Sequence, residues 1–312
     1  MNLETEIVDI LLAAFQSAPY LREQLDSIIA QSDPNWRILI HDGGSTDSTL
    51  DIIRTYTEKF PGKICFLGSS KASACTNFSL LMSASTSELI MLCDHDDIWL
   101  PDKIAETRER FIQETRKHPA GTPLLVFSDL IIVDRNLRII NASLMNYSNL
   151  NPQRLALSQL LVQNVPHGNT MMFNSALCKL AHPIPKKAVM HDNWIALTAA
   201  AFGRIAYLNR ATILYRQHEC NVFGASCYSF PSFLKKIYDG RKKLLFRWYM
   251  NVAQAQAFLE HHRARLAPEQ LDMLELFANI RHIGFFKKRY VLCRYKIWKT
   301  GFFRNLGMLI MI

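Results

Sequence analysis

The sequence predicts an α/β protein in which a mainly parallel sheet is flanked by helices and followed by a helical, basic C-terminal extension. Two patterns in residues 1–134 support the sheet: continuous apolar runs alternate with segments of helical periodicity, and a glycine-containing turn, Asp42–Ser45, follows the second run. The extension is indicated by a change in composition near residues 225–230, where we place its boundary.

The N-terminal elements alternate between strand and helix. Ile7–Phe15 is apolar throughout, as in a strand buried on both faces. Thr46 or Asp47 is placed to cap one helix, and Pro101 suits the first turn of another that runs to about Lys117. The expected strands are Ile7–Phe15, Trp36–Ile40, Ile64–Leu67, Glu88–Cys93 and Leu124–Phe127, and the helices between them include residues 19–31 and 76–84. This order implies right-handed crossovers between parallel strands.

Beyond Asp134 the pattern is looser. Ile139 and Ile140 close an expected hairpin. The further expected helices are Arg154–Gln163 and Asp192–Phe202, and the further expected strands are Asn169–Phe173, Ile205–Leu208 and Thr212–Tyr215. From Phe230 onward the sequence predicts helices throughout.

Composition narrows the class of protein. With 49% hydrophobic and 20% charged residues in 312, the chain is expected to bury a core. Its cysteine count is odd and no C-x-x-C pair occurs, which argues against a disulfide framework or a structural zinc and fits a cytoplasmic protein. The seven cysteines are Cys65, Cys75, Cys93, Cys178, Cys220, Cys227 and Cys293. We see no secretory signal at the N-terminus.

The net charge of +9 is concentrated at one end of the chain. Residues 1–229 hold 20 Lys/Arg and 22 Asp/Glu, net −2, whereas residues 230–312 hold 16 and 5, net +11. The basic residues are interleaved with aromatic ones and the segment ends in an apolar tail, which favours a helix lying on an anionic membrane surface. The alternatives are that these helices pack on the sheet domain or mediate dimerisation. No nucleic-acid-binding module is present in the extension, so we expect no nucleic-acid partner.

Polar residues follow three of the expected strands, at Ala14–Gln16, His41–Gly43 and Cys93–Asp97. Ligands of open parallel sheets bind beyond the carboxyl ends of strands. Asp94, Asp96 and Asp97 would place three carboxylates at one edge, and a divalent cation such as Mg²⁺ or Mn²⁺ would relieve their repulsion. A solvated acidic turn that caps the next helix is the alternative.

The motifs together resemble those of the family 2 glycosyltransferases, in particular the rhamnosyltransferase-like branch. The matching segments are residues 12–16, 20–28, 42–47, 77–78, 94–99, 191–194 and 215–218, in the family's order and spacing. The resemblance implies a GT-A fold with a nucleotide-sugar-binding half at about residues 1–134 and an acceptor half at residues 135–229. It also implies an inverting reaction.

The resemblance also assigns roles on the donor side. Asp96 is implied as the metal ligand, and Asp97 as a helix cap or a carboxylate behind the metal. The implied donor-binding residues are Ala14, Phe15, Gln16, Asp42, Asn77, Asp94, His95 and Arg216. Gly43 departs from the family, since relatives usually carry a second aspartate there that contacts the base.

On the acceptor side Asp192 is implied as the general base, which takes the proton of the attacking hydroxyl. An acid in the first turn of a helix is its alternative role. The implied acceptor-binding residues are Gly168, Asn169, His191 and Trp194, and His218 is implied as a second metal ligand. Some of these residues have an alternative role that does not involve a ligand. Trp194 and Trp99 would be packed in the core, Arg216 would form a surface ion pair, and His218 would be structural.

The sequence thus predicts a metal-dependent transferase that moves a sugar from a nucleotide-sugar donor to a glycan or lipid-linked acceptor for cell-surface polysaccharide. From the branch resemblance we expect rhamnose from dTDP-rhamnose. We expect the protein on the inner face of the cell membrane, with a homo-oligomer possible through its extension. An inactive carbohydrate- or membrane-binding relative is the alternative function.

Overall fold

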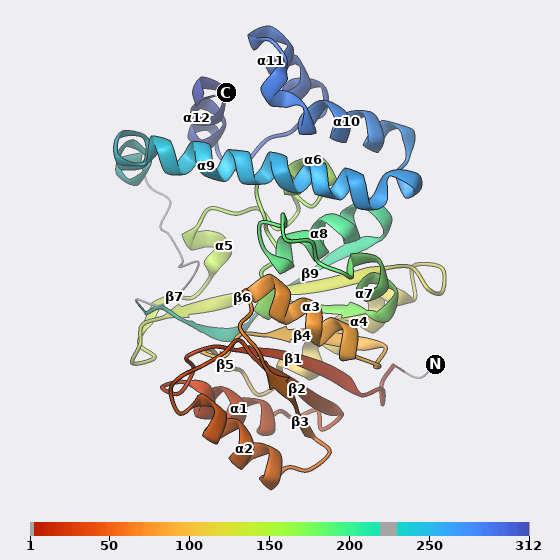
Figure 1. Cartoon of the computed structure of the whole chain (residues 1–312), viewed down its shortest axis with the longest axis vertical. Coiled ribbons are helices and arrows are strands. Elements are labelled where there is room, and N and C mark those ends of the chain that lie inside the picture. The colour runs from red at the N-terminus through yellow and green to blue at the C-terminus, as the bar shows by residue number, and fades with distance from the viewer. Residues whose placement is uncertain (1–2, 219–229, 312) are drawn as a thin grey trace.

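The computed structural model describes residues 3–218 and 230–311. In this part of the chain one mixed sheet has the strand order β3-β2-β1-β4-β8-β6-β9-β5, with β7 paired to β6. The strands are β1 (Val8–Ala14), β2 (Trp36–Asp42), β3 (Ile64–Ser69), β4 (Leu89–Cys93), β5 (Ile98–Trp99), β6 (Leu124–Val133), β7 (Ile139–Asn141), β8 (Met171–Asn174) and β9 (Arg204–Arg216). Figure 1 shows the sheet between two layers of helices.

The helices between the strands include those expected at residues 19–31, 76–84, 101–117 and 192–202, and two at residues 144–147 and 175–181 that were not predicted. They are α1 (Leu21–Ile29), α2 (Thr49–Lys59), α3 (Ala74–Ala84), α4 (Lys103–Thr115), α5 (Leu144–Tyr147), α6 (Leu157–Leu160), α7 (Ser175–Ala181), α8 (His191–Phe202) and the 3-10 turn η1 (Gly168–Thr170). The C-terminal helices are α9 (Phe230–His262), α10 (Pro268–Ala278), α11 (Phe285–Arg294) and α12 (Phe302–Met311), with 3-10 turns η2 (Arg263–Arg265) and η3 (Ile280–His282).

The predicted α/β fold is confirmed. β3, β2, β1 and β4 run parallel, as the alternating pattern requires, and β6 and β9 are parallel to each other. Between these two groups β8 is inserted antiparallel to both β4 and β6. The expected hairpin at Ile139 and Ile140 is also confirmed, because β7 pairs antiparallel with β6.

Four expected elements have different bounds. Ile205–Leu208 and Thr212–Tyr215 form one strand, β9, whose pairing with β6 shifts register at Ser128 and Asp129. Only Leu157–Leu160 of the expected helix 154–163 is helical, because the chain then turns to bury Leu161 and Val162 ahead of Pro166. The expected strand at Asn169 begins two residues later, after η1.

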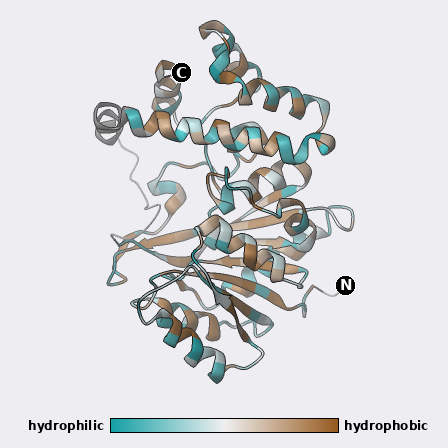
Figure 2. Ribbon diagram, viewed as in Figure 1, coloured by the Kyte–Doolittle hydropathy of each residue, from teal (hydrophilic) through white to brown (hydrophobic). Residues whose placement is uncertain are grey.

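The two faces of the sheet bury separate apolar clusters. The alternation of faces is clearest on β1, where Ile10 and Leu12 face α1, α2 and α4, and Leu11 faces α3 and α8. Figure 2 shows the apolar residues concentrated along the strands. The cluster that contains Leu11 continues into the extension through Trp248, Phe258 and Phe277, so α9 and α10 pack on the α8 side of the sheet.

The C-terminal extension therefore shares its core with the sheet domain. Figure 1 shows α9 lying across α6 and α8, with α10, α11 and α12 beyond it. Within the described residues, no helix combines the length and apolar character that crossing a bilayer requires. The domain boundary was expected near residues 225–230, and residues 225–229 of this range lie outside the described residues. Cys220 and Cys227 also lie outside them. The other five cysteines are free thiols.

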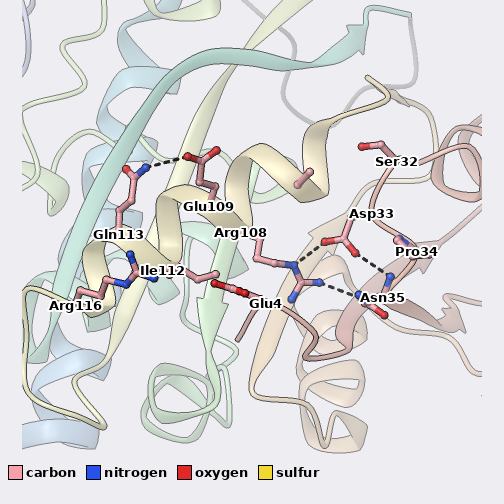
Figure 3. A pocket seen from close by; sticks show the side chains of 11 residues that line it. Glu4, Ser32, Asp33, Pro34, Asn35, Arg108, Glu109, Ile112, Gln113 and Arg116 are labelled. Carbon is pink, nitrogen blue, oxygen red and sulfur yellow. Dashed lines mark hydrogen bonds and ion pairs between the residues drawn. The ribbon is translucent and has the colours of Figure 1, made fainter. Parts of the chain in front are cut away.

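A buried arginine ties α4 to the amino ends of β1 and β2. Arg108 is 4% exposed and its Nε donates to Asp33 Oδ2 at 2.6 Å. Its other nitrogens donate to the carbonyls of Leu3, Glu6 and Asn35. Figure 3 shows Arg108 reaching Asp33 and Asn35 in the wall of a hollow of about 560 Å³. This hollow lies at the sheet edge opposite the carboxyl ends of these strands.

We predict that Arg108→Met lowers the free energy of unfolding by about 3 kcal/mol, because it leaves the Asp33 carboxylate without its charged partner and removes one donor from each of three carbonyls. Chemical unfolding followed by circular dichroism measures this. Arg54→Met is the matched control, since Arg54 pairs with Asp51 on the surface with 66% and 75% of the two side chains exposed. Its expected loss is below about 0.5 kcal/mol, and equal losses for the two variants would contradict the prediction.

Candidate active site

The carboxyl ends of β1, β2 and β4, the end of β9 and the start of α8 bring most of the predicted site residues together. The clearest contact is between Asp96, in the turn after β4, and His218, two residues beyond β9. His218 Nε2 lies 2.9 Å from Asp96 Oδ2. These are the two residues that the sequence resemblance implied as metal ligands, although 122 positions separate them in the chain.

The turn after β4 holds three carboxylates in a poorly solvated place. Asp96 is 8% exposed, Asp97 is fully buried and Asp94 is half-buried. Burial, followed by the charges of Asp96 and Asp192, raises the pKa of Asp94. Burial, followed by the charges of Asp96 and Asp94, raises the pKa of Asp97 well above its usual range. Such crowding favours either protonation or a bound cation.

The pair of Asp96 and His218 fits a divalent cation that also binds the substrate. Among the described residues no three His, Cys, Asp or Glu side chains are grouped to enclose a metal. Mg²⁺ typically takes one or two protein ligands and completes its shell with phosphate oxygens and water, and Mn²⁺ also accepts oxygen ligands of this kind. The donor set therefore suits a cation shared with a diphosphate.

Tyr20 supports this pair and had no assigned role in the sequence analysis. Its ring stacks on His218, with 4.7 Å between ring centroids, and the Arg216 guanidinium carbon lies 4.8 Å from the same ring centroid. The only sequence signal for Tyr20 was its place at the start of the motif at residues 20–28. Aromatic stacking of this kind fixes the plane of the imidazole.

Arg216 holds protein groups rather than facing outward. It is 3% exposed, and its guanidinium donates to the carbonyls of Asp96 and Arg135 and to the carboxylate of Glu23. The guanidinium thus links the turn after β4 to Glu23 of α1 and to the segment after β6, and its expected contact with the diphosphate stays a prediction. The alternative of an ion pair is confirmed in part, since Arg216 pairs with the exposed Glu23 while its own side chain is buried.

Asp97 does not cap a helix, contrary to the expectation for it. α4 begins only at Lys103, and both Asp97 oxygens are used elsewhere. Oδ2 accepts from Asn169 Nδ2 at 2.5 Å and Oδ1 accepts from the Arg216 backbone N–H at 3.1 Å. Asp97 therefore lies behind Asp96 and His218, the proposed metal ligands. This position corresponds to the second of the two roles that the sequence analysis gave for Asp97.

Ala14, Phe15 and Gln16 form the end of β1 and differ in exposure. Ala14 is buried and its carbonyl accepts from the Gly43 N–H at 2.8 Å. Phe15 is 53% exposed, so its ring is accessible to a ligand. Gln16 has a positive φ of 49°, and its Oε1 accepts from the N–H of Thr46 at 3.0 Å. Gln16 thereby ties the end of β1 to the loop that leads into α2.

Asp42 shapes the loop after β2. It is fully buried and accepts hydrogen bonds from the backbone N–H groups of Gly44 and Ser45 and from the hydroxyls of Ser45 and Ser69. Burial alone would raise the pKa of Asp42, but these hydrogen bonds lower it, so the carboxylate stays ionised. A direct contact between Asp42 and the donor stays a prediction, and its observed contacts are all within the loop and the neighbouring strand end.

Gly43 is closely surrounded at the position where relatives usually carry aspartate. A Cβ built there would lie 3.3 Å from the Ala14 carbonyl oxygen and 3.5 Å from Asn77 Nδ2. Asn77 is 3% exposed and its Oδ1 lies 2.8 Å from His41 Nδ1. Asn77 is thus paired with His41, which the sequence analysis did not single out, and its contact with the donor stays a prediction. His95 Nδ1 lies 3.2 Å from the carbonyl of Ala13 on β1.

Asp192 stands at the start of α8 with its carboxylate held by backbone groups. Oδ2 accepts from the Gly168 N–H at 3.2 Å, and Oδ1 accepts from the Asn193 N–H at 2.6 Å. Burial raises the pKa of Asp192 to about 6, against the lowering effect of these hydrogen bonds. A carboxylate with this pKa is ionised at neutral pH and yet basic enough to accept a proton.

His191 packs against Gly168 and Phe78 beside this carboxylate. Its ring stacks on Phe78 with 3.8 Å between centroids. A Cβ at Gly168 would lie 2.8 Å from His191 Nε2, so only glycine fits beneath the ring. Burial lowers the pKa of His191 to about 3, so the ring is neutral. It orients its neighbours rather than carrying charge.

Trp194, Trp99 and Asn169 are buried. For the two tryptophans this confirms the alternative of buried packing, and it corrects the expectation that Trp194 and Asn169 face the acceptor. Trp194 is fully buried, its indole N–H donates to the Ala181 carbonyl at 2.8 Å, and its ring packs on Phe258 of α9. Trp99 is 2% exposed and lies beneath the site in β5. Asn169 is 3% exposed and turns toward Asp97.

The sheet order and the polar strand ends define a GT-A glycosyltransferase fold. The structure is similar to that of S. aureus TarS 1–349 in complex with UDP-GlcNAc, with a TM-score of 0.54, 17% identity, and coverage of 97% of this chain and 90% of that one. It is also similar to the mannosyltransferase PcManGT from Pyrobaculum calidifontis in complex with GDP-Man and Mn²⁺, with a TM-score of 0.52, 15% identity, and coverage of 98% and 79%. At these identities the similarity establishes the fold.

The chain belongs to glycosyl transferase family 2, whose sequence model matches residues 9–180, more than half of its length. It is 25% identical over 221 residues to an uncharacterised glycosyltransferase of Nostoc sp., covering 69% of this chain and 66% of that protein. It is 27% identical over 111 residues to the putative teichuronic acid biosynthesis glycosyltransferase TuaG of Bacillus subtilis, covering 35% and 43%. The chain thus spans less than two thirds of the length of these relatives. The predicted family is confirmed, and the rhamnosyltransferase-like branch stays a prediction.

Proposed function

We propose that this chain is an inverting, divalent-cation-dependent glycosyltransferase that moves a sugar from a nucleotide-diphosphate donor to a hydroxyl of a glycan or lipid-linked acceptor. The observation that carries the proposal is that Asp96 contacts His218 in the turn after β4, while η1 bonds both to Asp97 of that turn and to Asp192 at the start of α8. A proton acceptor and a cation-binding pair at one sheet edge are what such a transfer needs.

Each residue has a distinct part in the proposed reaction. Asp192 takes the proton from the acceptor hydroxyl as its oxygen attacks the anomeric carbon. Attack from the side opposite the departing diphosphate inverts the configuration, and one base suffices for this displacement. Asp96 and His218 would hold the cation, which neutralises charge on the leaving diphosphate when bound. The exposed ring of Phe15 is available to the nucleotide base.

The donor sugar we propose to test first is rhamnose, as dTDP-rhamnose, on the resemblance of the motifs to the rhamnosyltransferase-like branch. UDP-GlcNAc and GDP-mannose, the ligands of the two structural neighbours, belong in the same panel. A role in cell-surface polysaccharide synthesis is supported by the likeness to TuaG. Turnover of one donor by purified protein with Mg²⁺ or Mn²⁺ is the experiment that tests the proposal as a whole.

We propose that the extension attaches the enzyme to the inner face of the cell membrane. Residues 276–312 hold eight Lys/Arg and no Asp/Glu. Large apolar side chains of α11 and α12 point outward, and Phe302, Leu306 and Ile310 recur every fourth residue. The most exposed are Phe286 at 85%, Phe302 at 73% and Ile310 at 71%. Cations beside exposed aromatic rings suit an anionic lipid surface.

The first prediction for this function concerns the cation. Asp96→Asn should lower the donor turnover rate by at least about 100-fold, because it removes a carboxylate ligand from a charge-neutralising site. A chelator in excess should abolish turnover by the unmodified protein, and added Mn²⁺ or Mg²⁺ should restore it. Asp51→Asn, on the surface of α2, is the control and should leave turnover unchanged. Full activity in excess chelator would falsify the proposed role of the cation.

The second prediction concerns the base. Asp192→Asn should lower the transfer rate by about 10²- to 10⁴-fold and change donor affinity by less than about threefold, because the carboxylate acts on the acceptor. In the unmodified protein the rate should fall as the pH drops through about 6, where Asp192 takes up a proton, and should be constant above it. Transfer kinetics between pH 5 and 8 and calorimetric donor binding measure both effects. A parallel loss of donor affinity would make Asp192 a donor-binding residue.

The third prediction concerns the membrane. The protein should co-sediment with anionic vesicles at low ionic strength and be partly released by high salt. Deleting the last 25 residues is a poor test, because it removes Leu292, Ile297 and Met308 from the core. Phe286→Ser combined with Phe302→Ser should instead weaken binding without lowering the melting temperature. Ile139→Ser, equally exposed on β7 at 67%, is the control. Equal binding to neutral vesicles, or binding to none, would leave α11 and α12 as a packing or dimer surface.

A further inference from the structure

A buried hydrogen bond joins the two sides of the proposed active site. Asn169 lies in η1, on the acceptor side, and Asp97 lies in the turn after β4, beside Asp96. We infer that Asn169 is a positioning residue, which fixes the proposed base Asp192 relative to the pair of Asp96 and His218. This inference rests on the proposed function and adds a residue that is inaccessible to substrate, since Asn169 is 3% exposed.

On the donor side the bond reaches the cation pair through Asp97. Asn169 Nδ2 donates to Asp97 Oδ2 at 2.5 Å, and Asp97 Oδ1 accepts from the Arg216 N–H at 3.1 Å. Arg216 Nε in turn donates to the Asp96 carbonyl at 3.1 Å. Because Arg216 stands two residues before His218, this set of bonds fixes the backbone on both sides of the pair of Asp96 and His218.

On the acceptor side the same turn holds the base. The Gly168 N–H, one residue before Asn169, donates to Asp192 Oδ2 at 3.2 Å. The absence of a side chain on Gly168 lets the His191 ring approach the backbone of η1. A shift of η1 would therefore move Gly168, which donates a hydrogen bond to Asp192 and also packs against the ring of His191.

It follows that η1 sets the position of Asp192 relative to the diphosphate that the acceptor hydroxyl displaces. In a direct displacement the hydroxyl that Asp192 activates must line up with the departing diphosphate, and a misplacement of about 1 Å costs on the order of 10²-fold in rate. Donor binding and donor hydrolysis by water do not require this alignment with an acceptor. Loss of the bond between Asn169 and Asp97 should thus affect transfer more than hydrolysis.

Asn169→Leu tests the inference, because leucine has a similar size and no donor. We expect the ratio of transfer to donor hydrolysis to fall by about 30-fold, with the dissociation constant for the nucleoside diphosphate changed by less than about threefold. Asn174→Leu is the matched control. Asn174 is also buried, at 6% exposure, but its side chain bonds only to the backbone of residues 122, 124 and 177. It should lower the melting temperature and leave the ratio unchanged.

An unchanged ratio in an active, folded Asn169→Leu protein would overturn the inference while leaving the proposed function intact. Absence of both transfer and hydrolysis in the unmodified protein would instead contradict the proposed function. If Asn169→Leu does not fold, Gly168→Ala tests the same turn, because its Cβ would lie 2.8 Å from His191 Nε2 and displace η1 from α8. The ratio should then fall in the same way, and an unchanged ratio would again overturn the inference.

Discussion

The buried carboxylate of Asp97 is the interaction on which the rest of the site depends. It lies where the end of β4, η1 and the end of β9 meet, and it accepts one hydrogen bond from each of the latter two. A carboxylate without donors in such a place would be strongly destabilising, so the three segments are held at one separation. The antiparallel insertion of β8 between β4 and β6 is what carries η1 to this point.

In this arrangement the three neighbouring aspartates have different contacts. Asp97 is committed to the protein, whereas the Asp96 carboxylate meets the His218 ring and Asp94 is half-buried. Burial and mutual repulsion raise the pKa of both Asp94 and Asp97, so the turn is electrostatically incomplete without positive charge. As proposed above, a divalent cation held by Asp96 and His218 would supply that charge and would also bind the diphosphate of a donor.

The sequence predicted well those features that depend on local pattern. β1, β2 and β4 are apolar runs of strand length, and their carboxyl ends follow directly from the alternation with helices. The antiparallel β8 and the single long β9 escaped prediction, because pairing across the sheet depends on contacts far apart in the chain. Similarly, the motifs led to Asp96 and His218, whose side chains are in contact, whereas the side chains of Trp194, Arg216 and Asn169 turn inward. A motif identifies a residue near a site, and only packing decides whether the side chain faces the ligand or supports a neighbour.

On the donor side, the contacts around Gly43 show how the loop after β2 accommodates glycine where relatives usually carry aspartate. At Gly43 the backbone is enclosed by the Ala14 carbonyl and by Asn77, whose amide is held by His41. A Cβ at this position would lie 3.3 Å from a main-chain oxygen that already accepts the Gly43 N–H, so a side chain here requires that backbone to move by a few tenths of an ångström. The acidic contact to the base that the family resemblance implied at this position has no counterpart at Gly43. Because Asp42 is fully buried within its own loop, we propose that the exposed ring of Phe15 meets the nucleotide base at this edge.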